Sequence, residues 1–225
     1  MKRIITLGII ALLICSGCAW FNPKAEPTAQ ELAEEGKNKF DKKNYRYAIQ
    51  VFEKLRDWYP FSELAILAEL KIAEAHFNLK QYEEAVIEYQ AFENLHPRNE
   101  LIPYIIYKTG LCYFNRVDTV DRDQTSAKKA LDTFNRLMIQ FPENEYANKS
   151  QAHIKKCLKN LAGNELYVAL YYYKKKHYKA ALHRFKSILA DYPDVGVHYK
   201  ASHYIALCEE LLKQQSYSKK DANKS

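Results

Sequence analysis

The chain has 225 residues, of which 48% are apolar and 13% aromatic, so it can bury a sizeable core and is not a disordered chain. Its six glycines and seven prolines are about half the usual share of these residues, which argues against a β-sandwich, a barrel or a glycine-rich nucleotide loop. The formal net charge of +7 is too modest to indicate a nucleic-acid partner. Many Lys, Glu, Ala and Leu residues favour an all-α fold.

Residues 1–17 are predicted to be a lipoprotein signal peptide. After a basic start, the apolar run 4–14 is too short for the ~20 residues of a membrane span but typical of a secretory signal. The small residues just before Cys18 resemble the bacterial lipoprotein signal, in which the cysteine becomes the lipidated first residue. Cys15 stands where that signal usually has Leu. Residues 18–27 then form a lipidated tether. The alternative is an ordinary cleaved signal that leaves Cys18 free.

A secretory signal predicts that the mature protein leaves the cytoplasm, so the residue after Cys18 and the remaining cysteines can be interpreted for an oxidising compartment. Ala19, rather than an Asp, follows the lipidated cysteine, which in lipoproteins resembling the enteric ones implies delivery to the outer membrane. The thiols of Cys112, Cys157 and Cys208 remain, an odd number at wide spacing, so no disulfide framework is predicted. Each lies in an apolar helical pattern and is interpreted as a buried, inert side chain rather than a redox group.

Four segments of the chain align with one another without a gap. Each has a small residue, an aromatic residue four positions on, an aliphatic or aromatic residue three further on and a closing proline five beyond that: Pro60, Pro97, Pro142 and Pro193. An earlier small residue marks the first helix of each pair: Gly36, Ala73, Gly110 and Ala169. The pattern resembles the tetratricopeptide repeat. We therefore predict a tetratricopeptide-repeat solenoid of about five helix pairs over residues 28–213.

Irregular spacing between the prolines locates the exceptions to the repeat. An insertion in the third repeat predicts a loop at residues 115–126, and one in the fourth predicts a continuous helix over about 145–175. A last helix, 196–213, is expected to cover the exposed end of the solenoid. Residues 214–225 are expected to form a disordered polar tail.

The sequence contains no pattern typical of a catalytic or cofactor site. It lacks a phosphate-binding loop, a zinc-spaced cysteine pair, an HExxH motif and a nucleophile elbow. His153 and Cys157 share a helix face, but with no third ligand in view core packing is the favoured interpretation. The lysines at 174–176 end a helix, where cations suit the helix dipole. We expect a chain that is not an enzyme and binds no cofactor, no metal and no nucleic acid.

Binding is then expected on the concave face, which first helices line in repeats of this kind. Counting from the small residue of the second and third repeats predicts a peptide-binding groove with these residues: Leu67, Leu70, Phe77, Asn78, Tyr104, Tyr107, Phe114 and Asn115. Aromatic rings beside amides suit an extended peptide. The alternative for Phe77 and Phe114 is that their rings pack between helices.

Three motifs resemble one family more narrowly. They are Trp58-Tyr59-Pro60-Phe61 after the first repeat, Asp121-Arg122-Asp123 with Ala127 in the loop, and the Phe-Pro-Glu-Asn run from residue 141 with Tyr146. Together with the lipoprotein signal they resemble the BamD family, also called YfiO or ComL, over essentially the whole chain. The resemblance implies a non-catalytic scaffold in the machine that folds β-barrel proteins into the outer membrane. It implies that the chain faces the periplasm, binds the periplasmic domains of BamA and unfolded barrel proteins, and meets other lipoproteins of that machinery.

Arg184 is the candidate contact to BamA. It stands between Ala181 and Phe185 of the fourth repeat, off the packed stripe, and is expected to face outward. The resemblance implies that it matches the arginine with which the family docks on BamA. Without the resemblance, the residue is interpreted as a solvated surface arginine.

Two other functions stay open for the whole chain. One is another repeat lipoprotein, such as a secretin pilotin or a cell-envelope division factor. The other is an enzyme acting on peptidoglycan, for which no paired carboxylates can be assigned.

Overall fold

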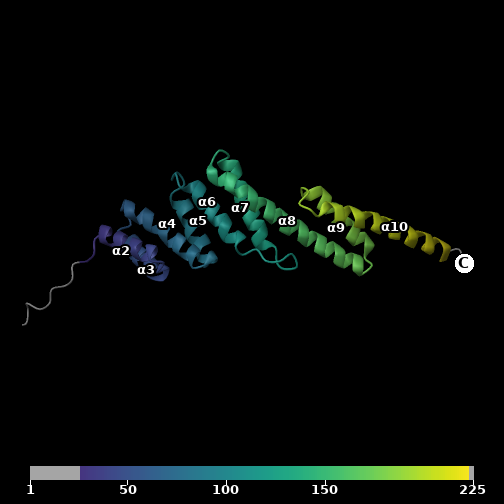
Figure 1. The fold of residues 1–225 in the computed structure, drawn as a ribbon, viewed down its shortest axis with the longest axis horizontal. Helices are drawn as coiled ribbons and strands as arrows, with labels where there is room; N and C mark the ends of the chain where they lie inside the picture. Colours follow the sequence, from purple (N-terminus) through teal and green to yellow (C-terminus); the bar gives the residue numbers. More distant parts are fainter. Residues whose placement is uncertain (1–25, 223–225) are drawn as a thin grey trace, which may run out of the picture.

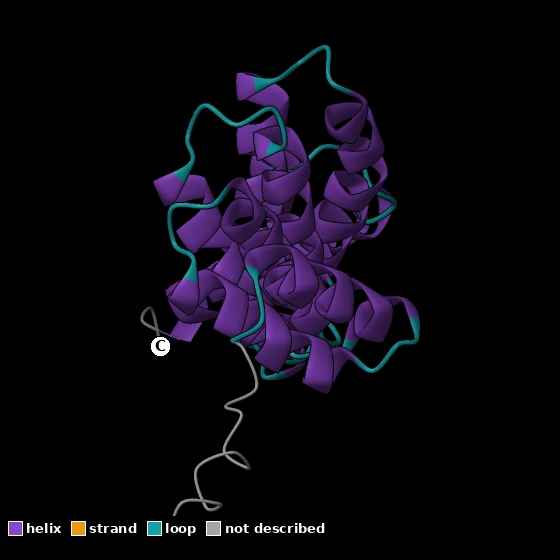
Figure 2. Ribbon diagram, turned by 90° about the vertical axis from the view of Figure 1, so that its left-hand side faces the viewer, coloured by secondary structure: helices purple, strands orange, loops and turns teal. Residues whose placement is uncertain are grey.

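The computed structural model describes residues 26–222, and this part of the chain forms nine α-helices and no strand (Figures 1 and 2). The helices are α2 (Ala29–Asp41), α3 (Tyr45–Trp58), α4 (Glu63–Asn78), α5 (Tyr82–Leu95), α6 (Ile102–Phe114), α7 (Thr125–Gln140), α8 (Glu145–Lys174), α9 (Tyr178–Asp191) and α10 (His198–Ala222). They follow one another along the long axis of the molecule (Figure 1). The all-α prediction is therefore confirmed.

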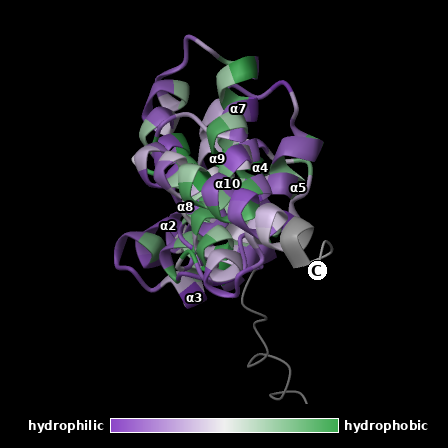
Figure 3. Ribbon diagram, turned by 90° about the vertical axis from the view of Figure 1, so that its right-hand side faces the viewer, coloured by the Kyte–Doolittle hydropathy of each residue, from purple (hydrophilic) through white to green (hydrophobic). Residues whose placement is uncertain are grey.

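Neighbouring helices in the chain are also neighbours in space. The main contacts join each helix to the next, from α2 with α3 to α9 with α10, and α2 with α4 and α6 with α8 across one helix. Hydrophobic stretches run along the middle of the helices, while the connecting loops are mostly hydrophilic (Figure 3). Packing that depends on nearest neighbours is the hallmark of a helical-repeat solenoid. The predicted tetratricopeptide-type pairing is confirmed.

Small residues allow the two helices of a pair to cross closely. A Cβ atom added to Gly36 would lie 2.6 Å from the ring of Phe52, and one added to Gly110 would lie 2.5 Å from the ring of Phe134. Both rings are almost fully buried. In these two pairs the glycine and the aromatic residue therefore depend on each other, because the ring fills the space that a side chain on the first helix would take.

The turns between paired helices share one unusual backbone feature. A lysine with φ near +60° stands two positions before the second helix in three pairs: Lys43, Lys80 and Lys176. The next amide bonds back to a carbonyl five residues earlier, as in Gln81 N to His76 O at 3.0 Å. This closes the first helix with a Schellman-type turn. A residue other than glycine pays about 1–2 kcal/mol in the left-handed region, so glycine is the usual sign of such a turn. These three turns have lysine instead, and the sequence therefore does not predict them.

The fourth pair begins with the long helix that the sequence predicts. Asn144 caps α8 by accepting the amide of Tyr146 at 2.9 Å. The helix packs against α6 and α7 and also against α9. It also fixes the loop between α6 and α7: Asn160 donates to the carbonyl of Asp118 at 2.9 Å, and Asn164 donates to that of Val120 at 2.6 Å.

The predicted disordered tail is wrong for residues 214–222. Helix α10 continues to Ala222 instead of ending at residue 213. The segment after Val197 contains neither glycine nor proline, and its Lys, Gln and Glu residues favour a helix even where it is exposed. Gln214 donates to Glu210 at 3.1 Å along this exposed face. Residues 223–225 lie outside the described residues.

The predicted signal peptide, Cys18 and most of the tether also lie outside the described residues. The structure begins just before α2, where Thr28 and Glu31 form a capping box. Among residues 26–222, none of the helices combines the length and the apolar character needed to cross a bilayer.

Candidate functional site

A cavity of about 490 Å³ opens between the first helices of the first two pairs, α2 and α4. Its walls combine apolar side chains with Lys37 and Lys71: Gln30, Ala33, Glu34, Lys37, Phe40, Asp41, Phe52, Leu64, Leu67 and Lys71 line it. Leu67 was predicted from the sequence, and it is exposed at this cavity. The first-repeat residues were missed, although counting from Gly36 by the same rule would have found four of them: Gln30, Ala33, Phe40 and Asp41.

Lysines cover aromatic rings of the preceding repeat along the first helices. The ammonium of Lys71 lies 4.9 Å from the ring centre of Phe40, and that of Lys108 lies 3.3 Å from the ring centre of Phe77. Each lysine stands two positions before the small crossing residue of its helix. Further along, Lys156 lies 5.9 Å from Phe114. These cation–π contacts place a row of positive charges on Phe77 and Phe114, which the sequence assigned to the groove, and on Phe40, which it did not.

The middle lysine of this row, Lys108, is partly buried near Glu74. Burial lowers the pKa of Lys108, and the nearby Glu74 carboxylate raises it in part. Glu74 itself accepts bonds from the ammonium of Lys71 at 2.7 Å and from the hydroxyl of Tyr104 at 2.6 Å. Burial, followed by that bond to Glu74, raises the pKa of Tyr104 far above its usual value. Tyr104 is therefore held in place by Glu74 rather than free in the groove.

Tyr107 and Phe114 surround a half-buried histidine of α8. His153 stacks on Phe134 at 5.3 Å between ring centres, and Phe114 meets it edge-on at 4.7 Å. The hydroxyl of Tyr107 lies 3.5 Å from its Nε2 atom. The alternative that Phe114 packs between helices is therefore confirmed. Cys157, one turn further on, is buried beside the same rings, so this pair belongs to the packing of α7 and α8.

The remaining groove predictions divide by exposure. Asn78 and Asn115 are exposed, and Phe77 is partly buried and packs edge-on against Tyr82 at 5.6 Å. Leu70 is only 7% exposed and belongs to the core, so its assignment to the groove is wrong. Its side chain packs instead with Tyr89 and Ile105, in the cluster between the second and third helix pairs.

Arg184 of α9 lies at a second cavity, of about 430 Å³. Its guanidinium donates to Glu165 of α8 at 2.7 Å and lies 5.8 Å from the ring centre of Tyr172. The side chain is 40% exposed, as expected for a residue off the packed stripe. The sequence does not predict its intramolecular partner, the Glu165 carboxylate, which fixes the guanidinium. One bond to Glu165 leaves other N–H groups of the five-donor guanidinium for a second acceptor.

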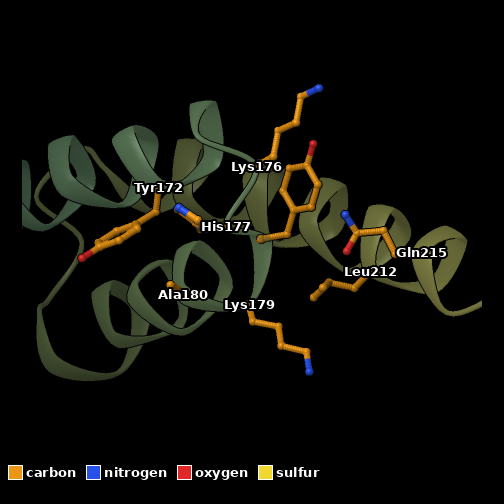
Figure 4. A pocket seen from close by; sticks show the side chains of 8 residues that line it. Tyr172, Lys176, His177, Lys179, Ala180, Leu212 and Gln215 are labelled. Carbon is orange, nitrogen blue, oxygen red and sulfur yellow. The ribbon is translucent and has the colours of Figure 1, made fainter. Parts of the chain in front are cut away.

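A neighbouring cavity of about 480 Å³ lies where the α8–α9 turn meets α10 (Figure 4). Tyr172 borders both cavities. Lys176 and Lys179 point to opposite sides of the opening (Figure 4). Leu212 and Gln215 complete the wall, so the helix at residues 214–222 begins at this surface instead of trailing from it.

Comparisons with known proteins identify the family. The family model of YfiO, described as an outer membrane lipoprotein, matches residues 25–224. The chain belongs to the YfiO family. Two relatives named outer membrane protein assembly factor BamD come from Rickettsia prowazekii, 33% identical over 85% of this chain and 77% of the relative, and Neisseria gonorrhoeae, 30% identical over 85% and 78%. A solved tetratricopeptide repeat protein from Parabacteroides merdae is 15% identical, with a TM-score of 0.44 over 87% of this chain and 78% of that protein.

The motifs that resembled the YfiO family have structural roles. Tyr59 of the first motif donates its hydroxyl to the carbonyl of Pro27 at 2.8 Å, which ties the end of α3 to the start of the domain. In the loop motif, Asp123 accepts the amide of Thr125 at 2.9 Å at the start of α7. The third motif supplies the cap of α8. Each motif therefore marks a junction between helices.

Proposed function

We propose that this chain is a non-catalytic scaffold lipoprotein of outer membrane protein assembly, held on the inner face of the outer membrane by a lipid on Cys18. Membership of the YfiO family and the name that its relatives carry support this function. The cavity between α2 and α4 carries the proposal within the structure, because it offers the Phe40 ring, Leu67 and charged side chains of both signs on the face that repeat proteins use for binding.

The proposed substrate is an unfolded β-barrel outer membrane protein, bound through its aromatic C-terminal strand. The partly buried ring of Phe40 suits an aromatic side chain, and Lys37 and Lys71 suit main-chain carbonyls and carboxylates. Leu67 lies exposed at the same cavity, and its apolar side chain can take part in no hydrogen bond or ion pair. Substitution at Leu67 therefore tests binding with little risk to the fold.

Calorimetry with a synthetic C-terminal strand of a β-barrel protein tests the groove. Leu67→Asp should weaken binding to the mature lipoprotein by about 1–3 kcal/mol, the scale of a central interface residue. Ile87→Asp is the matched control, because Ile87 is an exposed aliphatic residue of the second helix α5 and does not line the cavity. Equal affinity of wild type and Leu67→Asp would place substrate binding on another surface.

The proposed machine partner is BamA, which docks through its periplasmic domains on Arg184 and the cavity beside it. Other lipoproteins of the machinery are proposed as further partners. Purification of the tagged lipoprotein in mild detergent tests this assignment. Copurification of BamA supports it, whereas a secretin ring or a division complex in its place would favour the other repeat-lipoprotein functions.

A further inference from the structure

Two exposed aromatic side chains stand together at the end of the first helix pair. Phe61, in the turn between α3 and α4, is 101% exposed, and Trp58, the last residue of α3, is 46% exposed. They stand three positions apart in the chain, so their Cα atoms lie within about 11 Å of each other. We call Trp58, Pro60 and Phe61 the aromatic patch. Phe61 is left fully exposed by the described residues, and Trp58 is partly covered by Lys54, so the two residues form a small exposed apolar patch.

The aromatic patch lies where the chain enters the domain. Tyr59, inside the patch segment, donates its hydroxyl to the carbonyl of Pro27 at 2.8 Å. Tyr59 and Leu64 also pack against the cluster formed by α2, α3 and α4. Hence the patch is held beside the first described residues, at the α2–α3 end of the molecule (Figure 1).

The tether limits how far the patch can be from the bilayer. Nine residues lead from Cys18 to Pro27, and at full extension they span about 30 Å. At such distances, tethering gives an effective concentration in the millimolar range, so a weak contact with the same membrane is strongly populated.

We propose that the aromatic patch contacts the interfacial region of the bilayer that holds the lipid of Cys18. The inference rests on the lipidation proposed above. Tryptophan favours the headgroup level of a bilayer, and a phenylalanine beside it adds apolar area below that level. The ammonium of Lys54 lies 4.0 Å from the Trp58 ring centre, where it can meet lipid phosphate while its stem covers the ring. A protein partner would not explain why the patch lies at the tether.

The consequence is a second point of attachment. A single lipid anchor allows the solenoid to rotate and tilt freely about its tether. A second contact at Trp58 and Phe61 fixes the α2–α3 end at the membrane surface, and the rest of the row of helices then extends away from a defined point.

The two tryptophans of the chain, Trp20 and Trp58, allow a direct test. In the mature lipoprotein with Trp20→Phe, reconstituted into phosphatidylcholine vesicles, Trp58 is the sole tryptophan. The fluorescence emission of Trp58 should be shifted to the blue relative to that of a tryptophan exposed to water. It should also be quenched by doxyl-labelled lipid. Phe61→Ser in the same background should reduce the quenching. Ile139→Ser, which removes an apolar side chain that is 80% exposed from α7, should leave it unchanged.

The reciprocal variant, Trp58→Phe, separates the anchor from the patch, because its sole tryptophan, Trp20, stands two residues after Cys18. Quenching of Trp20 without quenching of Trp58 would overturn the proposal while leaving the anchor intact, and would assign the patch to a protein partner. Loss of quenching at both tryptophans would overturn the anchor and the patch together.

Discussion

Arg184 acts within its own chain before it meets any partner. Its bond to Glu165 lies at a partly exposed site, where such a pair contributes about 1 kcal/mol or less. The pair holds the guanidinium on Tyr172 beside the cavity, so a partner carboxylate would meet a donor that is already oriented. Arg184→Glu would place a second carboxylate beside Glu165 and destabilise the domain. A loss of binding in that variant could then not be separated from a loss of stability.

Arg184→Gln is therefore the informative change. It should reduce copurification of BamA, since a neutral amide replaces a charge-assisted bond, and lower the free energy of unfolding by about 1 kcal/mol or less. Lys186→Gln is the matched control, because Lys186 lies on the same helix and forms an exposed pair with Glu209 at 2.7 Å. If both variants retain BamA equally, docking uses another face. Unfolding in urea and quantitative copurification provide the two measurements.

His153 makes the stability of the domain depend on pH. Burial, followed by the charge of Lys156, lowers its pKa, and its buried Nδ1 atom has no hydrogen-bond partner among the described residues. The unfolded chain therefore binds this proton at higher pH than the folded chain. Its contribution to stability is complete above the unfolded pKa of about 6.5 and is lost as pH falls below it.

His153→Phe should flatten that dependence, because a phenylalanine ring fits among Phe114 and Phe134 and cannot be protonated. The midpoint of thermal unfolding, followed by circular dichroism from pH 7.5 to 5, should fall less for the variant than for wild type. His203→Phe, at an exposed position of α10, should follow the wild-type curve. A slope of the His153→Phe curve equal to that of wild type would contradict the role of burial at this site.

At the scale of the elements, the helix crossings are less tolerant than the helix surfaces. Gly110→Ala would put a Cβ 2.5 Å from the buried Phe134 ring, so α6 and α7 would have to separate. Overpacking of this kind should cost about 1–3 kcal/mol of unfolding free energy in urea. Gly163→Ala in α8 meets only a methyl of the loop residue Val120 and should be less harmful, since alanine favours the helix. Equal stability of both variants would show that the α6–α7 crossing is not close.

The sequence predicts the elements well and their connections less well. Helix faces and the long α8 follow from spacing, because burial imposes a period on the chain. The Schellman-type turn at Lys80 and the bond of Arg184 to Glu165, 19 residues away, leave no such period. The bonds of Asn160 and Asn164 to the α6–α7 loop likewise leave no period in the sequence. Leu70 was misplaced for the opposite reason, since spacing alone does not distinguish a groove from the core beside it.

At the scale of the whole molecule, the proposed function requires the solenoid to stay at one membrane. The lipid on Cys18 is the proposed anchor, and the aromatic patch is its proposed accessory. Interfacial contact by two rings is reversible, whereas a cysteine carrying several acyl chains is held stably. The two contacts therefore have different tasks: the lipid retains the protein, and the patch orients it.

Cys18→Ala should consequently leave the protein uncleaved or release it from the outer membrane, and the aromatic patch alone should not retain it. Membrane fractionation with immunoblotting, which also reports the cleavage of the signal peptide, measures this outcome. Cys208→Ala is the control: burial raises the pKa of that thiol, so it is unreactive, and the substitution should leave localisation unchanged. Mature-sized Cys18→Ala protein in the outer membrane fraction would show that an attachment other than the lipid holds the domain there.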